Sequence, residues 1–153
     1  MRLEAENRVF HGGTYAGSPM TLAASAAALG VLRDGGEALT SQLFAHAERL
    51  GRELKRLVEK AGFSCALQGV GPMFQLFFTD GAVDRLVNYR EAEAHCNKLL
   101  FREWQHAAQR NGVYFHPSQY ECFFVSTAIT SLDVDETLAR MERATDELRR
   151  SAA

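Results

Sequence analysis

The segment HGGTYAGSPM, residues 11–20, is the first place in the chain whose residue types could hold a ligand. The glycines at 12 and 13 allow close backbone approach, and Thr14 adds a hydroxyl. Ser18 can cap a helix and Pro19 is tolerated at the first helical position, so a helix is expected to begin here. Phosphate favours such a combination of free N–H groups, a hydroxyl and small residues. The segment predicts an anion site, although a turn that binds nothing can have the same composition.

Glu121 is a second candidate. It follows the polar loop of residues 117–120 and precedes an apolar stretch that is expected to be a strand. A strand end is a position from which a carboxylate can be presented to a cleft. The alternative is a solvated glutamate at the end of a loop, and both interpretations stay open on these residues alone.

The remaining reactive side chains argue against metal or nucleophilic chemistry. The five histidines show no ligand spacing, so no metal site is expected. No serine lies in a GxSxG motif, and Cys122 is expected to be a buried thiol rather than a partner of His116. A Schiff-base lysine needs a desolvated pocket. The only lysines, Lys55, Lys60 and Lys98, fall within amphipathic helices, so none is expected to be catalytic.

Two helices are expected to follow the opening segment. From Thr21 to Leu32 nearly every residue is apolar or alanine, and a helix without a polar face must be buried on all sides. The run 34–36, Asp-Gly-Gly, is expected to end it. Residues 37–61 have apolar positions spaced by threes and fours, which predicts an amphipathic helix ending at a left-handed Gly62.

The second half of the chain predicts a small sheet with further helices. Short aromatic-rich runs indicate strands, and longer periodic runs indicate helices. The expected elements are strands 63–67 and 73–78, a helix 89–110, a strand pair 113–115 and 122–125, and a last helix opening near Thr130 or Ser131. This order predicts an α+β fold with helices packed on one face of a largely antiparallel sheet.

Composition limits the classes of function. The chain has 153 residues and a net charge of −2, with no dense basic block, so neither nucleic acid nor a membrane surface is expected as a partner. Its three cysteines are far apart and fit reduced thiols in the cytoplasm. The charged N-terminus predicts no targeting segment. The longest apolar run, about twelve residues, is too short for a bilayer, which needs about 20.

Four stretches occur together in the order and spacing of a known family: HGGTYAGSPMTLAASAAAL, VGPMFQLFF, VNYREAEAHCNKLLFREW and NGVYFHPSQYECFFVSTAIT. On these the chain, from Phe10 to Leu148, resembles the C-terminal part of class III pyridoxal-phosphate aminotransferases. Many class III enzymes share the first motif. The PSQYE loop after GVY, with NY at the head of the preceding helix, points to the branch of glutamate-1-semialdehyde 2,1-aminomutases.

The resemblance implies a cofactor and a set of site residues. The anion would be the phosphate of pyridoxal phosphate, contacted across a dimer by Gly13 and Thr14. The glutamate of the family's PSxFE motif, on the substrate side of the pocket, corresponds to Glu121. The implied architecture is the C-terminal small domain of a fold-type I enzyme, residues 36–153, preceded by the phosphate-contacting loop and an apolar interdomain helix, residues 1–35. The implied partners are a second copy or the upstream half of the enzyme, and a small amino acid substrate.

Two departures from the family bear on function. The family's Schiff-base lysine, the aspartate at the pyridine nitrogen and the ring-stacking aromatic all lie upstream of the Gly-Thr motif. No catalytic residue is therefore expected in this chain, which implies a fragment that is inactive alone. The aminomutases have histidine in AHT where this chain has Ile129, which leaves an aminotransferase of another amino acid open. A non-catalytic module that packs on a partner, and an α+β domain with only vestigial likeness, are the further alternatives.

Overall fold

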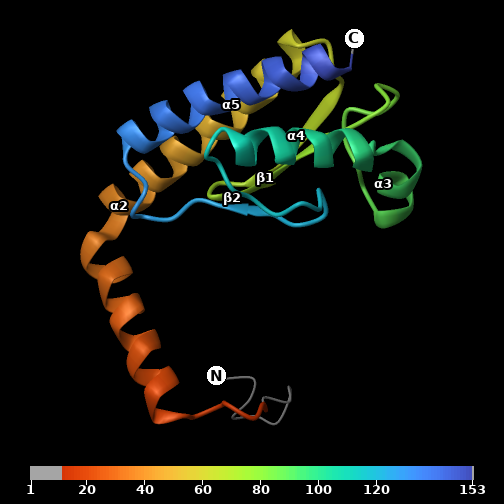
Figure 1. The fold of residues 1–153 in the computed structure, drawn as a ribbon. Helices are drawn as coiled ribbons and strands as arrows, with labels where there is room; N and C mark the ends of the chain where they lie inside the picture. The colour runs from red at the N-terminus through yellow and green to blue at the C-terminus, as the bar shows by residue number, and fades with distance from the viewer. Residues whose placement is uncertain (1–11, 153) are drawn as a thin grey trace. The chain divides into compact units, whose positions relative to one another are not determined.

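The computed structural model describes residues 12–152, and its elements follow the predicted α+β order (Figure 1). The strands form one antiparallel sheet in the order β1-β2-β3. The elements are helix α2 (Pro19–Lys60), strands β1 (Cys65–Val70) and β2 (Met73–Phe78), helices α3 (Tyr89–His95) and α4 (Lys98–Arg110), strand β3 (Phe123–Phe124) and helix α5 (Ser131–Ser151). The predicted fold class is therefore confirmed.

The chain divides into two compact units, Met1–Thr40 and Ser41–Ala153, and α2 contributes to both. The predicted helix end at residues 34–36 is confirmed, because α2 consists of two helices that meet at a kink there. Gly36 makes this kink, with φ 53° and ψ −146°, a conformation that glycine adopts without a steric penalty.

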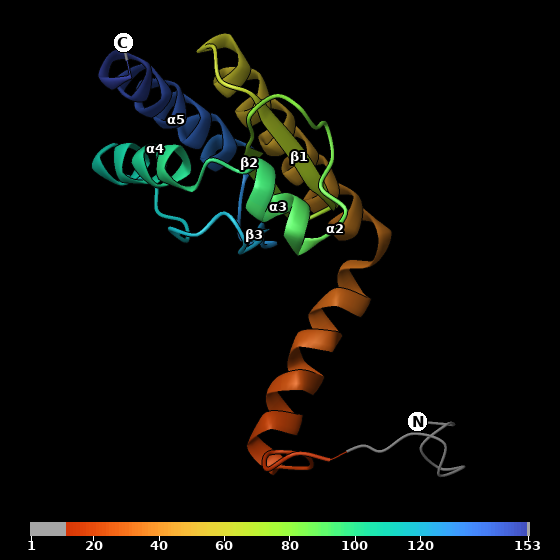
Figure 2. The ribbon, with the colours of Figure 1, turned by 90° about the vertical axis from the view of Figure 1, so that its right-hand side faces the viewer.

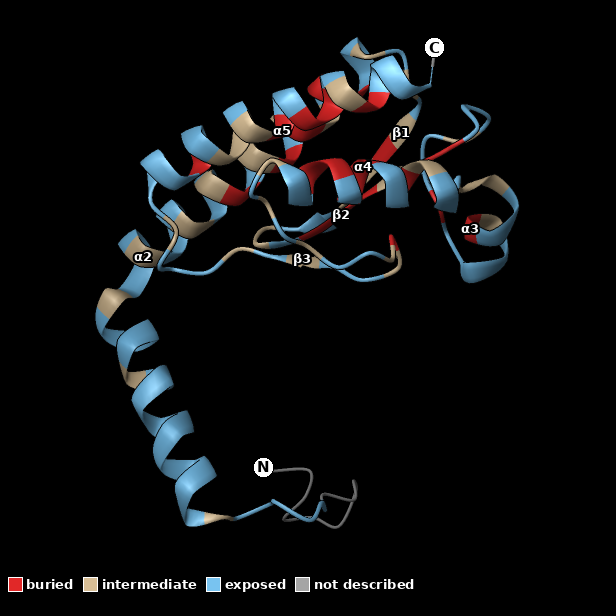
Figure 3. Cartoon of the chain, viewed as in Figure 1, coloured by how far each residue is buried: buried red, intermediate tan, exposed pale blue. Residues whose placement is uncertain are grey.

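The part of α2 in the first unit is apolar and exposed (Figure 3). Met20 is 85% exposed and Leu29 64% exposed. The burial expected for this helix is thus not found in the single chain. Residues 12–40 offer one helical segment and the turn before it, and within this described part of the first unit the helix has no second element on which to pack.

The second unit has one core, formed between β2 and the helices α2, α4 and α5. Alternate residues of β2, Phe74, Leu76 and Phe78, are buried on the same face of the sheet. Helices α4 and α5 lie side by side (Figures 1 and 2). Between them, the fully buried Trp104 donates a hydrogen bond from Nε1 to Oγ1 of Thr145 at 2.9 Å.

Contacts with β2 interrupt the helix predicted over residues 89–110. Cys96 forms an isolated bridge with Thr79, and the N–H of Asn97 donates to the carbonyl of Phe78 at 2.9 Å. The Asn97 side chain then caps α4 by accepting from the N–H of Leu100 at 3.0 Å. Tertiary pairing at residues 96–97 therefore splits the periodic segment into α3 and α4.

The predicted strand at residues 113–115 is also wrong. The carbonyl of Phe115 accepts from Nε2 of Gln105 at 2.9 Å, so a side chain of α4 binds it instead of a neighbouring strand. The Phe115 ring packs 5.1 Å from Trp104 and 5.0 Å from Phe123, between ring centroids. Of the predicted pair, only β3 is a strand, and it pairs with β2.

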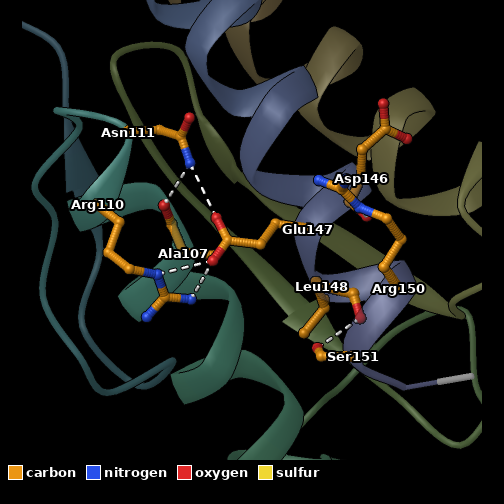
Figure 4. Close-up of polar contacts among 8 residues, drawn as sticks. All are labelled: Ala107, Arg110, Asn111, Asp146, Glu147, Leu148, Arg150 and Ser151. Carbon is orange, nitrogen blue, oxygen red and sulfur yellow. Dashed lines mark hydrogen bonds and ion pairs between the residues drawn. The ribbon is translucent and has the colours of Figure 1, made fainter.

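Polar contacts tie the ends of α4 and α5 together (Figure 4). Nε of Arg110 donates to Oε1 of Glu147 at 2.7 Å, and Nδ2 of Asn111 donates to Oε2 of the same carboxylate at 3.2 Å. The Asn111 amide also donates to the carbonyl of Ala107 at 2.9 Å. These contacts close the C-terminal turn of α4 against α5.

The helices within residues 12–152 include none with the length and apolar character that a membrane span requires.

Helix α5 begins where its sequence predicts. Thr130 and Asp133 form a capping box, in which each side chain binds the backbone N–H of the other residue. The bonds from the Thr130 side chain and backbone hold the pKa of the Asp133 carboxyl below its usual range. Both N–H groups would otherwise lack an intrahelical partner.

We expect Thr130→Ala to lower the free energy of unfolding by about 1 kcal/mol, the usual effect of losing a threonine N-cap. Thr127→Ala, an exposed threonine in the turn before the helix, is the matched control and should have little effect. Urea unfolding monitored by circular dichroism measures both. Equal effects of the two changes would contradict the role of the cap.

Candidate functional site

Gly13 and Thr14 lie in a pair of consecutive tight turns just before α2. The N–H of Ala16 donates to the carbonyl of Gly13 at 3.0 Å, and the N–H of Ser18 donates to the carbonyl of Tyr15 at 3.1 Å. Thr14 is exposed. A β-carbon built on Gly13 would have no heavy atom within 4 Å, so the backbone there is open to approach.

This turn fits one part of pyridoxal phosphate. An accessible threonine hydroxyl beside an open glycine backbone suits a phosphate, which is recognised by short polar donors. The aldehyde of the cofactor finds no amine to bind covalently, because each lysine is ion-paired and none is buried: Lys55 to Glu59, Lys60 to Glu142 and Lys98 to Glu93. The described residues could therefore contact the phosphate but offer no desolvated amine.

Glu121 is exposed at the end of the loop that runs from residue 116 to 121. Its N–H donates to the carbonyl of Ser118 at 3.3 Å, which closes a tight turn. The N–H of Ser118 in turn donates to Nδ1 of His116 at 3.1 Å. Thr14 and Glu121 belong to different units of the chain.

The two residues before Glu121 are anchored to different elements. Gln119 is buried, and its Oε1 accepts from the N–H of Phe78 at 3.0 Å, at an edge of β2 beyond the end of β3. Its Nε2 has no partner in the described structure. The hydroxyl of Tyr120 donates to Oε1 of Glu93 on α3 at 2.9 Å.

Glu93 is the centre of a polar cluster that sequence reasoning missed. Nζ of Lys98 donates to Oε1 of Glu93 at 2.5 Å and lies 5.5 Å from the centroid of the Tyr120 ring. Tyr89 packs beside Tyr120 with ring centroids 5.7 Å apart. Hydrogen bonds from Lys98 and then Tyr120 hold the pKa of the Glu93 carboxyl below its usual range.

A cleft of about 290 Å³ lies beside this cluster. Its wall includes a reciprocal contact in which Gln68 donates to the carbonyl of Leu86 at 2.9 Å and accepts from its N–H at 2.6 Å. The lining residues come from both strands of the hairpin, from the 82–95 segment and from the loop: Gln68, Phe77, Leu86, Val87, Asn88, Tyr89, Ala92 and Tyr120. The cleft combines two tyrosine rings with amide groups.

The lowered pKa of Glu93 predicts a pH dependence. A carboxyl whose pKa is lower in the folded state stabilises the fold above its unfolded value, 4.5, and loses that effect as the pH falls through the folded value. We therefore expect wild type to be more stable than Glu93→Gln at neutral pH, with the difference shrinking below pH 4.5. Urea unfolding of both proteins across this range measures it. A difference that does not change with pH would contradict the assignment.

Cys122 is exposed, so its predicted burial is wrong: side chains alternate along a strand, and Phe123 takes the inward position against Phe74. Burial, and then Glu59, raises the pKa of the Cys65 thiol to about 12. No group of three or more metal-ligating side chains occurs in the region that the structure describes. His11 lies outside the described residues.

Comparison with known proteins relates the chain to one group of enzymes. The glutamate-1-semialdehyde 2,1-aminomutase of Pyrobaculum arsenaticum is 33% identical over 141 residues, which cover 92% of this chain and 32% of the relative. That of Thermoplasma volcanium is 31% identical over 150 residues, which cover 95% of this chain and 33% of the relative. The chain thus spans about a third of the length of the curated relatives it matches. No family model matches it.

Solved structures agree with the sequence relation. The FumI protein of Sphingopyxis sp. MTA144, solved with pyridoxal phosphate, is 26% identical with a TM-score of 0.69, over 97% of this chain and 32% of that one. An omega-transaminase from Sphaerobacter thermophilus has a TM-score of 0.70 at 18% identity, over 93% of this chain and 31% of that one. At this identity the likeness is evidence of a shared fold alone. The predicted resemblance is therefore confirmed: in sequence and in fold, the chain matches the C-terminal third of class III pyridoxal-phosphate aminotransferases, and its sequence relatives are glutamate-1-semialdehyde 2,1-aminomutases.

Proposed function

We propose that this chain is the C-terminal part of a pyridoxal-phosphate-dependent aminomutase or aminotransferase, and that it supplies a phosphate contact and part of the substrate pocket. The observation that carries the proposal is the relation to the aminomutases over 92% of the chain. Bound pyridoxal phosphate supplies an electron sink for chemistry at the carbon that bears the substrate amine. The groups of this chain bind and orient, and the reactive amine comes from the rest of the enzyme.

Gly13 and Thr14 are proposed to hold the cofactor phosphate of a neighbouring subunit. Three properties of the first unit support this role: the exposed hydroxyl, the open backbone at Gly13, and the start of a helix at Pro19. The exposed apolar surface of α2 supports a partner in the complete enzyme, because such a surface is costly to leave in water. We propose a second copy of the enzyme as that partner.

Glu121 is proposed to line the substrate side of the pocket. The exposure of its side chain and the fixed turn that precedes it support this role. The position of the family's histidine is taken by Ile129, whose carbonyl contacts Nδ1 of His46 at 3.1 Å. An isoleucine side chain provides no hydrogen bond to a substrate. This difference favours an aminotransferase of another amino acid as the second candidate.

A chimera tests the proposal. The preceding two thirds of the Pyrobaculum arsenaticum enzyme would be joined to this chain in place of its own matching third. We expect the purified chimera to retain about one pyridoxal phosphate per chain by absorbance, and the present chain alone to form no stoichiometric adduct after borohydride reduction and intact-mass analysis. A folded chimera without cofactor would contradict the proposal and support a non-catalytic module.

Substrate kinetics of the same chimera test Glu121. Glu121→Gln should raise the KM for the amino substrate with little change in the free energy of unfolding, because the side chain is exposed and acts on the substrate. Glu103→Gln, an exposed glutamate of α4, is the matched control. Parallel losses of stability and activity in the Glu121 variant would indicate a structural role instead.

A further inference from the structure

We infer that Glu93 is a positioning residue, which holds the loop of residues 116–121 through Tyr120 and thereby directs the carboxylate of Glu121. The inference rests on the proposed role of Glu121 and assigns the residue that would control its placement. Glu93 lies on α3 and Glu121 ends the loop, so the link between them is tertiary.

The two side chains just before Glu121 bind the loop to two different elements. Gln119 is 2% exposed and binds the backbone of β2, whereas Tyr120, the next residue, binds Glu93. Two consecutive side chains attached to different elements leave their backbone little freedom to rotate. The N–H of Tyr120 also donates to Oγ of Ser118 at 3.2 Å. The direction of the following residue is therefore set by these contacts.

Glu93 accepts the hydrogen bond that holds Tyr120 in place. Its Oε1 receives both the Tyr120 hydroxyl and the Lys98 ammonium. Because the helix is interrupted at residues 96–97, Lys98 is the first residue of α4 and its ammonium reaches back to α3. The ammonium and the ring of Tyr89 then pack against Tyr120. One carboxylate thus joins α3, α4 and the loop.

The cluster around Glu93 has more contacts than an ordinary surface ion pair. Isolated exposed pairs contribute little because solvent screens them and long side chains lose entropy. Here a neutral donor and a cation share one acceptor, and the donor's ring carries two further contacts. Burial, and then the bond to Glu93, raises the pKa of the Tyr120 hydroxyl, which agrees with its role as a donor.

Amide hydrogen exchange in the 153-residue chain tests the anchor. Glu93→Ala removes the acceptor, Tyr120→Phe removes only the hydroxyl, and Glu103→Ala is the control. We expect both test variants to speed exchange at the amides of Tyr120 and Glu121 about 5-fold, the effect of one net hydrogen bond. Because both variants remove the same hydrogen bond between Glu93 and Tyr120, the double variant should exchange no faster than Glu93→Ala alone. Ultraviolet titration of Glu93→Ala should show a lower pKa for Tyr120.

Exchange rates in Glu93→Ala and Tyr120→Phe equal to those of Glu103→Ala would overturn the inference, as would additive effects in the double variant. Kinetics in the chimera separate this inference from the proposed function. A raised KM in both Glu93→Ala and Glu121→Gln supports both proposals. A raised KM in Glu121→Gln alone overturns the positioning role and leaves the proposed function in place. An unchanged KM in Glu121→Gln contradicts the role of Glu121 itself, and the positioning role fails with it.

Discussion

Trp104→Ala is expected to lower the free energy of unfolding by about 3–5 kcal/mol, the usual range for removing a large aromatic side chain from a core. Trp104 is fully buried, and its ring centroid lies 5.3 Å from that of Phe78 and 5.1 Å from that of Phe115. Its loss leaves a cavity where β2, α4 and the 113–115 segment meet. It also removes the donor to Thr145, whose hydroxyl remains bound to the carbonyl of Met141.

Leu99→Ala is the matched control for this experiment. Leu99 is on the same helix and is 66% exposed, so its truncation should change stability by less than about 0.5 kcal/mol. Urea unfolding measures both variants. Trp104→Phe should fall between them, because it keeps most of the packing and loses the N–H. A small effect of Trp104→Ala would mean that this core is not the one that stabilises the second unit.

Thr14→Val, made in the chimera, is expected to weaken pyridoxal phosphate binding by about 1–3 kcal/mol, or roughly 5- to 150-fold, the range for a hydrogen bond to a charged group. Valine keeps the shape of threonine and removes only the hydroxyl. The exposed position of Thr14 means that the change should leave the fold intact. Cofactor retention after dialysis, followed by absorbance, measures the effect.

Thr21→Val is the control for the cofactor experiment, because Thr21 is also exposed but lies within α2 rather than in the turn before it. It should retain the cofactor as the parent chimera does. If Thr14→Val also retained it fully, Thr14 would not contact the phosphate. The phosphate site would then have to be sought elsewhere in the enzyme.

Local signals predicted the elements that depend on local interactions. The bounds of β2, the start of α2 at Pro19 and the start of α5 after Thr130 agree with the prediction, because strand patterning and helix caps are encoded by adjacent residues. Gly62, with φ 92°, ends the amphipathic half of α2 as expected. The roles of Gly13, Thr14 and Glu121 stay predictions.

Tertiary contacts determined the features that local signals did not predict. Residues 89–110 have helical periodicity, yet pairing of residues 96–97 with β2 divides them, and Phe115 enters the core instead of a strand. The same break brings Lys98 to Glu93, five residues apart, and Glu93 to Tyr120, 27 residues apart. The sequence by itself determined the α+β class, the cap of α5 and the family relation. Only the fold could assemble the cluster around Glu93, because its contacts join segments whose proximity depends on the packing of α3, α4 and the loop around β2.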